Sequence, residues 1–304
     1  MKITSIQTVD AAKMERYTIK DFRKQFPDDD TCLEWLKQYL FPQGIHCKMC
    51  QKVTKHHKVA SRKSYSCDRC GHHVHPTAGT IYHKSSTPLT DWFYAVYLMA
   101  STRCGISAKQ LERELGVTYK TAWRMFHQIR SMLNETDSKI GGHAEQVEVD
   151  ETYVGGQTKM AKKLKNKTTI VGALDRKGLV IAEIAPDRTA ATLMPFIEDK
   201  IQPYSTVYTD EHRGYNAVSV SNNKYRHETV NHSAKTWVIG DAHTNSIEGF
   251  WSLLKGGIRG VYKGRPTRKY LQNYVNEFAF RYNRRRDQTP MFLSFLGQVR
   301  TSAD

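Results

Sequence analysis

The chain has 304 residues, enough to bury a sizeable core and to form two or three domains. Its 46 lysines and arginines outnumber its 30 aspartates and glutamates, which gives a formal net charge of +16. This excess favours polyanionic partners, with nucleic acid first and an anionic membrane surface second. No apolar segment approaches the roughly 20 residues that span a bilayer, and residues 1–30 lack the apolar core of a signal peptide. We therefore expect a cytoplasmic, nucleoid-associated protein without a membrane-spanning segment.

The first predicted element is a helix that begins in the acidic run Asp28-Asp29-Asp30-Thr31. Leu33, Leu36 and Leu40 fall on one stripe of this helix, and Phe41-Pro42-Gln43-Gly44 ends it. The acidic run is best explained as an N-terminal cap.

Two cysteine pairs follow, Cys47-Lys48-Met49-Cys50 and Cys67-Asp68-Arg69-Cys70, separated by a basic hairpin. In a reducing compartment such pairs hold metal more often than they form disulfides, and this spacing suits a tetrahedral four-cysteine Zn²⁺ site. Because a small hairpin has little core, the metal would supply much of its folding free energy, on the order of 10–16 kcal/mol. We therefore predict a structural zinc ribbon within residues 1–85. Neighbouring histidines are alternative ligands: His46, His72, His73 and His75.

Residues 86–142 are predicted to be helical. Thr90-Asp91 would cap a first helix; a second would begin after Ser107 and stop at Gly116, and a third would begin near Thr118. The last two match a helix-turn-helix, whose second helix enters the major groove of DNA by its N-terminal residues. The alternative is an ordinary helical hairpin. Three residues would face DNA: Tyr119, Lys120 and Arg124.

Residues 143–304 change from a helical to an alternating pattern, and Gly141-Gly142 forms the linker before them. The order strand, strand, strand, helix, strand predicts an α/β fold in which a mixed sheet is flanked by helices, as in ribonuclease-H-like domains. The predicted elements are residues 147–154, 168–174, 179–184, 189–201 and 205–210.

Acidic residues occur on two predicted strands and on one predicted helix of this domain. Asp150 lies in the strand that runs into Gly155-Gly156, and Asp210 ends the fourth strand. A helix predicted to begin near Asp241-Ala242-His243 places Ile247, Phe250, Trp251 and Leu254 on one side, and Asn245, Glu248, Ser252 and Lys255 on the other. Taken alone, the strand could be an edge strand with solvated acids, and the helix could have a solvated polar face. Their combination favours a shared site.

Carboxylates that converge without cations repel one another and raise one another's pKa. Two Mg²⁺ (or Mn²⁺) ions relieve this repulsion and can activate a water or a DNA 3′-OH for attack on a phosphodiester. We expect Asp150 to bridge the two ions, and Asp210 and Glu248 to hold one each. Lys255, two turns after Glu248, would hold a DNA phosphate near the metals. The absence of a glycine-rich phosphate loop argues against a nucleoside triphosphate as energy source.

Several motifs in order give the chain a resemblance to bacterial insertion-sequence transposases of the ISXO2-like kind. Besides the cysteine pairs and residues 105–123, they are Asp150-Glu151-Thr152-Tyr153-Val154-Gly155-Gly156, Asp210-Glu211-His212-Arg213-Gly214-Tyr215, residues 243–255 and residues 277–285. The resemblance covers nearly everything after residue 27. It implies a DDE-type transposase that cuts DNA at terminal inverted repeats, joins the 3′-OH ends to target DNA, and works as a homodimer or higher oligomer.

The third active-site residue is Asn or Glu in members of this group, and the chain offers both Asn245 and Glu248. Glu248 is favoured because a carboxylate binds Mg²⁺ better and because its spacing from Lys255 matches the usual Glu-and-Lys arrangement. The tail from Lys255 to Arg286 is rich in basic residues and tyrosines. This pattern favours a surface that binds DNA ends or target DNA, and the alternative is a solvated basic face. The DNA-binding candidates in it are Arg259, Lys263 and Arg265.

Two other functions fit the same residues. One is a sequence-specific DNA-binding regulator derived from a transposase, which would have no catalytic activity. The other is a metal-dependent nuclease that cleaves DNA without joining the 3′-OH ends to a target.

Overall fold

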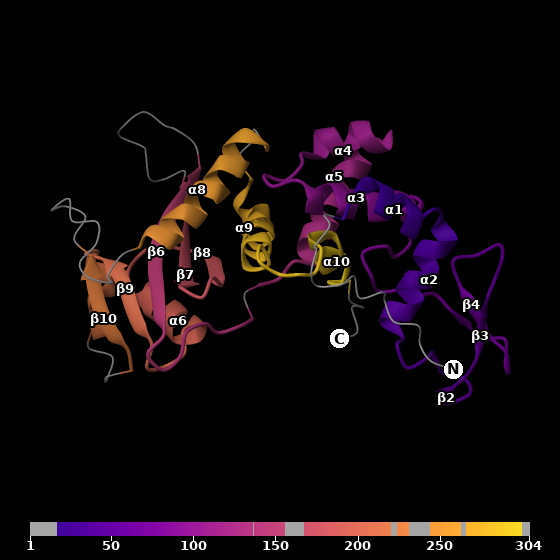
Figure 1. The fold of residues 1–304 in the computed structure, drawn as a ribbon, viewed down its shortest axis with the longest axis horizontal. Helices are drawn as coiled ribbons and strands as arrows, with labels where there is room; N and C mark the ends of the chain where they lie inside the picture. Colours follow the sequence, from indigo (N-terminus) through magenta and orange to yellow (C-terminus); the bar gives the residue numbers. More distant parts are fainter. Residues whose placement is uncertain are drawn as a thin grey trace. The chain divides into compact units, whose positions relative to one another are not determined.

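The computed structural model describes residues 17–135, 137–155, 167–219, 224–230, 244–262 and 266–299. The chain forms two compact units, and Figure 1 shows the elements of each. The first unit contains the described residues up to 132 together with 287–299, and the second contains those from 133 to 286. No helix within these ranges is both long and apolar enough to cross a membrane. The predicted domain boundaries at residues 85 and 142 stay predictions.

Two helices begin the first unit: α1 (Ile19–Gln25) and α2 (Asp29–Leu40). The side chain of Asp28 accepts a hydrogen bond from the backbone N–H of Thr31, so the acidic run does cap α2. Leu33 and Leu36 are fully buried. The helix therefore has the cap and the apolar stripe that the sequence predicts, whereas α1 was not anticipated.

Five short strands follow and form two small antiparallel sheets. The pair β1 and β2 forms one sheet, and β4 lies between β3 and β5 in the other. These sheets carry the two cysteine pairs, as the predicted hairpin requires. The strands are β1 (His46–Cys47), β2 (Lys52–Val53), β3 (His56–Lys58), β4 (Tyr65–Cys67) and β5 (His73–Val74).

Four helices complete the first unit: α3 (Leu89–Ser101), α4 (Ala108–Leu115), α5 (Tyr119–Ser131) and α10 (Met291–Leu296). The prediction that Thr90-Asp91 caps α3 was wrong, because the helix begins at Leu89, directly after Pro88. The backbone N–H and hydroxyl of Thr90 instead donate to Asp29 of α2, at 2.9 and 3.0 Å. These bonds link two helices that are far apart in sequence.

Both α4 and α5 begin with a side-chain cap, of which the cap at Ser107 and the start of α5 near Thr118 were predicted. The Ser107 hydroxyl accepts a hydrogen bond from the N–H of Gln110, and Thr118 accepts one from Thr121. Gly116 ends α4 with φ = 63°, a left-handed conformation that glycine adopts at little cost. Two helices joined by a tight turn are thus present where the sequence places them.

A five-stranded mixed sheet forms the centre of the second unit, in the order β10-β9-β6-β7-β8. Strands β6, β7 and β8 are antiparallel neighbours, whereas β6 pairs with β9 and β9 with β10 in parallel. The first four strands in sequence were predicted, and β10 was not. They are β6 (Gln146–Gly155), β7 (Lys167–Asp175), β8 (Val180–Ala185), β9 (Thr206–Asp210) and β10 (Arg226–Val230).

Helices cover both faces of this sheet (Figure 1). The helix α6 (Ala190–Lys200) packs on one face, while α8 (Asn245–Gly260) and α9 (Arg268–Asn283) pack on the other. As predicted, α8 buries one apolar side on the sheet, made of Ile247, Phe250, Trp251 and Leu254. Its predicted start at residues 241–243 lies outside the described residues, and the helix begins at Asn245.

Candidate functional site

The site is organised by the alternation of side chains along β6. Val147 and Val149 belong to the core under α6, whereas Val154 belongs to the core under α8 and α9. Because neighbouring residues of a strand point to opposite faces, the even-numbered residues of β6 face α8. Glu148 and Asp150 are therefore directed toward the same helix.

Asp150 is tied to α8 by a hydrogen bond from the indole Nε1–H of Trp251 to its Oδ2, at 3.0 Å. Gly172 of β7 pairs directly with Asp150 across the sheet. A Cβ atom at Gly172 would lie only 2.6 Å from Cη2 of Trp251. The absence of a side chain at Gly172 thus lets the indole lie against the sheet and reach the carboxylate.

Asp210 ends the parallel strand next to β6. Tyr208 pairs with Glu148, so Asp210 and Asp150 each lie two residues further along neighbouring strands and on the same face. The backbone N–H of His212 donates to Asp210 Oδ1 at 2.9 Å. Burial raises the pKa of Asp150 to about 7, and the charges of Glu151 and Asp210 add to the rise. A cation that binds here would favour the ionised form of Asp150.

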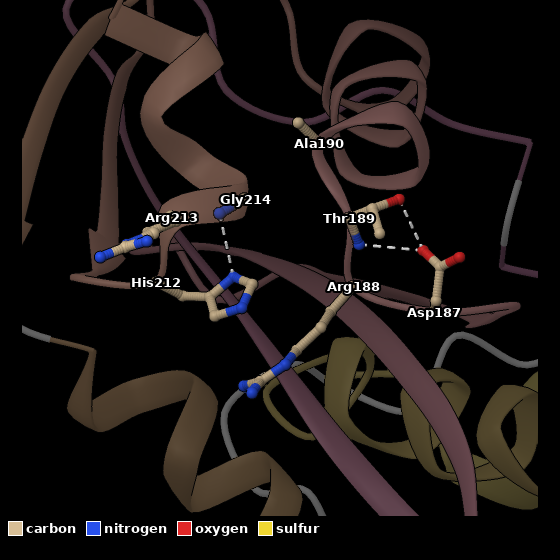
Figure 2. Close-up of a pocket in the computed structure, with 7 residues that line it drawn as sticks. All are labelled: Asp187, Arg188, Thr189, Ala190, His212, Arg213 and Gly214. Atoms are coloured by element: carbon tan, nitrogen blue, oxygen red, sulfur yellow. Dashed lines mark hydrogen bonds between the residues drawn. The ribbon is translucent and has the colours of Figure 1, made fainter.

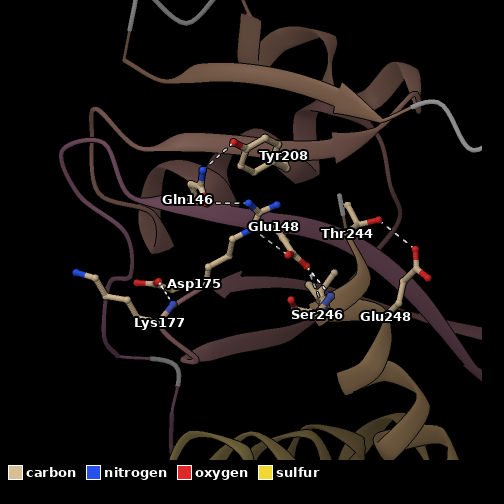
Figure 3. Close-up of polar contacts among 10 residues, drawn as sticks. Gln146, Glu148, Asp175, Lys177, Tyr208, Thr244, Ser246 and Glu248 are labelled. Carbon is tan, nitrogen blue, oxygen red and sulfur yellow. Dashed lines mark hydrogen bonds and ion pairs between the residues drawn. The ribbon is translucent and has the colours of Figure 1, made fainter. Parts of the chain in front are cut away.

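Glu148, which sequence analysis did not single out, is fully buried. It accepts hydrogen bonds from the backbone N–H groups of Ser246 and Ile247 at 2.9 and 3.0 Å, and from Arg176 Nε at 3.3 Å (Figure 3). A carboxylate at the N-terminus of a helix interacts favourably with its dipole and with its unpaired N–H groups. Glu148 thereby fixes where α8 begins above the sheet. The signal for it was a second acid on the same strand face as Asp150.

Glu248 and Asn245, the two candidates for the third position, both lie in the first turn of α8, and Glu248 is closer than Asn245 to Trp251 around the helix. At 100° per residue, Glu248 is about 60° from Trp251 around the helix, whereas Asn245 is about 120° away. Glu248 is exposed, and its Oε1 accepts a hydrogen bond from the Thr244 hydroxyl at 3.1 Å (Figure 3). Within the described residues, Asp150, Asp210 and Glu248 do not bring three oxygens within 4.8 Å of one another.

Lys255 follows Trp251 by four residues and is half-buried on the same side of α8. Burial lowers the pKa of its ammonium group, and the charges of Arg259 and Lys167 lower it further, while the charge of Asp150 raises it. The electrostatic influence of Asp150 means that the structure brings Lys255 and this carboxylate into one neighbourhood. Asp150, Asp210, Trp251 and Lys255 thus gather on the α8 face of the sheet.

The other face of β6 carries Glu151, which is bound to Tyr215 and Arg188. The Tyr215 hydroxyl donates to Glu151 Oε2 at 2.9 Å, and Arg188 Nη1 donates to Oε1 at 3.1 Å. Arg188 and His212 also line a cavity of about 460 Å³, shown in Figure 2. The residues that line it include both signs of charge: Asp187, Arg188, Thr189, Ala190, His212, Arg213 and Gly214.

The four predicted zinc ligands converge in the first unit. All sulfur atoms of Cys47, Cys50, Cys67 and Cys70 lie within 4.8 Å of one another, and the Cys47–Cys70 and Cys50–Cys67 separations are 3.5 and 3.9 Å. Tetrahedral Zn–S bonds of about 2.3 Å require sulfur separations of about 3.8 Å, so the cluster fits Zn²⁺. No histidine belongs to this cluster within the described chain, which disfavours the alternative ligands.

Both cysteine pairs are shaped by the same backbone turn. The N–H of Gln51 donates to the carbonyl of Cys47, and the N–H of Gly71 donates to that of Cys67, each at 2.9 Å. Gln51 and Gly71 have φ values of 54° and 71°, in the left-handed region. A hydrogen bond from the Thr54 hydroxyl lowers the pKa of the Cys67 thiol to about 5, with help from backbone N–H groups. This sulfur is therefore suited to bind a metal at neutral pH.

The residues predicted to bind DNA differ in their exposure. Tyr119 and Lys120 are exposed at the start of α5, and Arg259 is exposed near the end of α8. Arg124 is half-buried, donates to Ser85 at 3.3 Å and lies over the ring of Trp92. Its role in DNA binding, like that of the other three, stays a prediction. Lys263 and Arg265 lie outside the described residues.

Comparison with known proteins places these features in a family. Residues 141–283 match the ISXO2-like transposase domain, and residues 27–73 match a transposase zinc-ribbon domain. A protein in transposable element ISH50 of Halobacterium salinarum is 26% identical over 275 residues, which cover 83% of this chain and 91% of that protein. A transposase-like protein of Haemophilus influenzae is 32% identical over 104 residues, covering 34% of this chain and 80% of its own length. The chain thus belongs to the ISXO2-like transposases of insertion sequences and carries their zinc ribbon.

Proposed function

We propose that this transposase binds the terminal inverted repeats of its element, cleaves DNA there and joins the 3′-OH ends to target DNA. The observation that carries the proposal is the pair Asp150 and Asp210 on one face of adjoining parallel strands, with the pKa of Asp150 raised to about 7. Two neighbouring carboxylates in a half-buried position are costly to ionise unless a cation joins them. The pair therefore supports a site for divalent metal.

The metal ligands in this proposal are Asp150, Asp210 and Glu248. Asp150 would contribute to holding both Mg²⁺ or Mn²⁺ ions, and Asp210 and Glu248 would hold one each. When bound, such ions activate the attacking water or 3′-OH and stabilise the leaving oxygen. Trp251 orients Asp150 through its indole N–H, and Lys255 holds a DNA phosphate beside the acids.

The sheet supports a ribonuclease-H-like assignment for this unit. Three antiparallel strands, a crossover helix and two further parallel strands follow one another in the sequence, and the first strand lies in the middle of the sheet. In this arrangement the middle of β6, which carries Asp150, lies next to the end of β9, which carries Asp210. The same topology leaves α8 to cover the acids from one face.

Glu248 is proposed over Asn245 as the third ligand because of the direction in which α8 faces. The hydrogen bond between Trp251 and Asp150 fixes one side of the helix toward the acids. Glu248 lies about 60° from that side and Asn245 about 120°. Glu248 would exchange its hydrogen bond with the Thr244 hydroxyl for the metal ion.

The first unit is proposed to recognise DNA. The turn between α4 and α5, with Tyr119 and Lys120 exposed at the start of α5, supports a helix-turn-helix that enters the major groove. The zinc ribbon would add to this surface and hold its fold. Because two ends must be joined together, we propose assembly of a homodimer or higher oligomer on paired DNA ends, in the nucleoid.

A cleavage assay on end DNA separates the two candidates for the third ligand. With Mg²⁺ present, Glu248→Ala should abolish cleavage while the affinity for end DNA, measured without divalent metal, stays within about twofold. Asn245→Ala should keep cleavage at saturating DNA. Retained cleavage in Glu248→Ala together with its loss in saturated Asn245→Ala would transfer the third role to Asn245.

A further inference from the structure

A second cavity, of about 360 Å³, lies at the start of α8 on the side away from Asp150. Three segments of the second unit form it: the turn between β7 and β8, the first turns of α8, and the end of α9. Three arginines line it, and no carboxylate does: Arg176, Arg285 and Arg286. Its volume falls within the roughly 300–1,000 Å³ of typical ligand pockets, and it is larger than a single ion requires.

Two of the three arginines, Arg176 and Arg285, are held in place by contacts with the protein. Arg176 donates from Nη1 to Gln146 at 2.7 Å and from Nε to the buried Glu148. Arg285 lies over the ring of Tyr282 with its Cζ 3.7 Å from the centroid, and its Nη1 donates to the carbonyl of Gly178 at 2.8 Å. A Cβ atom at Gly178 would lie 3.0 Å from Nη2 of Arg285, so this glycine leaves room for the guanidinium. These two guanidinium groups are therefore positioned before any ligand arrives.

Residues that line this cavity have hydrogen-bond donors that could bind a ligand. Neither Arg285 nor Arg286 has an ion-pair partner in the part of the chain that the structure describes, and Arg286 is exposed. Asn245 lines the same pocket and contributes an amide group. Leu253, which is 56% exposed, and Tyr282 supply an apolar wall. Guanidinium groups beside an apolar wall suit a phosphate attached to a sugar and base.

We propose that this pocket, lined by Arg176, Arg285, Arg286 and Asn245, binds one nucleotide unit of the DNA strand close to the bond that is cleaved. The inference rests on the proposed function, since it assigns a part of the same DNA substrate. Asn245 and Trp251 are six residues apart, about 9 Å along α8 at 1.5 Å per residue. Because Asn245 also lies about 120° from Trp251 around the helix, the strand passes around the start of α8, and the bound phosphate lies several nucleotides from the position beside Asp150.

This assignment gives Asn245 a role of its own. Instead of holding a metal, its amide donates to the DNA backbone one helical turn before Glu248. Asn245→Asp keeps the size and the helix-starting position of the side chain but places a negative charge among the arginines. It should weaken DNA binding through repulsion of the phosphate, whereas a metal-ligand role predicts unchanged DNA binding when no divalent metal is present.

The test uses the full-length protein, end DNA and buffer without divalent metal. Affinity is measured as a function of salt for unchanged protein, Arg286→Gln, Asn245→Asp and the control Lys224→Gln. Lys224 also loses one positive charge, but it pairs with Glu198 near the far end of α6. Arg286→Gln should weaken binding about tenfold or more and reduce the salt slope by about one, because one phosphate contact is lost. Lys224→Gln should change neither quantity.

A second experiment identifies which DNA phosphate binds in the pocket. Single phosphates of the end DNA are replaced in turn by neutral methylphosphonate, and each DNA is tested with unchanged protein and with Arg286→Gln. At one position several nucleotides from the cleavage site, the methylphosphonate should weaken binding to unchanged protein but not to the variant, because both remove the same contact. Additive losses at every position, or an unaltered salt slope in Arg286→Gln, would overturn the pocket while leaving the proposed function intact. Failure of unchanged protein to bind any end DNA would overturn both.

Discussion

Replacing Asp150 by asparagine should make the metal-free protein more stable at neutral and higher pH. Burial raises the pKa of this carboxyl to about 7, whereas an unfolded aspartate titrates near 3.9. Because the folded state binds the proton more tightly than the unfolded state, stability falls as the pH rises from about 4 to about 7. The cost is absent below this window, where both states are protonated, and fully present above it.

The size of the effect follows from the pKa shift. A change of about three units corresponds to about 4 kcal/mol at 1.36 kcal/mol per unit, which is an upper estimate for the gain at pH 8. The asparagine oxygen can still accept the hydrogen bond from Trp251, so the substitution removes the charge and keeps the contact. At about 2–4 °C per kcal/mol, the melting temperature of the second unit should rise by up to about 8–16 °C at pH 8 and by nothing at pH 4.

Calorimetric unfolding at pH 4, 6 and 8, without Mg²⁺ and without chelator, measures this difference. Asp187→Asn is the control of opposite sign: hydrogen bonds from Thr189 and Thr192 hold the pKa of Asp187 below its usual range. Its stabilising contribution is present above pH about 4, so its loss should lower the melting temperature at pH 8. Mg²⁺ should stabilise the unchanged protein and not Asp150→Asn. A melting temperature for Asp150→Asn at pH 8 that equals or falls below that of unchanged protein would show that the charge of Asp150 does not destabilise the metal-free fold.

Three other substitutions or treatments have defined outcomes. Gly172→Ala should lower the free energy of unfolding by about 1–3 kcal/mol and reduce cleavage, because the new methyl group displaces Trp251. Denaturant titration measures the free energy of unfolding, and unchanged stability would contradict this prediction. Glu148→Ala should cost about 3–5 kcal/mol, since Arg176 and two helix N–H groups lose their buried partner, and Glu148→Gln should cost less. Chelation of zinc should expose residues 46–74 to limited proteolysis and weaken end binding, and a ribbon that resists protease without zinc would contradict the four-cysteine site.

Local features were predicted well because they depend on residues close in sequence. The caps at Asp28 and Ser107 and the left-handed end of α4 at Gly116 are set within one turn of the chain. The spacing of the two cysteine pairs is enough to predict the zinc site. Likewise, the alternation of β6 and the apolar stripe of α8 identify the faces that pack together, so the positions of Asp150 and Trp251 on those faces could be foreseen.

The residues that hold Asp150 and α8 in place were not predicted, because their contacts join segments that are far apart in the sequence. Sequence alternation places Glu148 on the same side as Asp150, but it gives no sign that Glu148 is fully buried under the N-terminus of α8. Gly172 is an unremarkable glycine in the sequence, and only its position opposite Asp150 explains it. The strand β10 was missed because it is an edge strand in which Val230 alone is fully buried.

The proposed function requires Asp150 to belong to a metal site at which DNA ends are joined to a target. Its most direct test is a strand-transfer assay with purified protein, Mg²⁺ or Mn²⁺, a pre-cut end from the element's own terminal repeat and a supercoiled plasmid, with Asp150→Ala as control. We predict joined product that requires metal and is absent with Asp150→Ala. Tight binding of the end without joined product under either metal, or equal product from Asp150→Ala, would contradict the account.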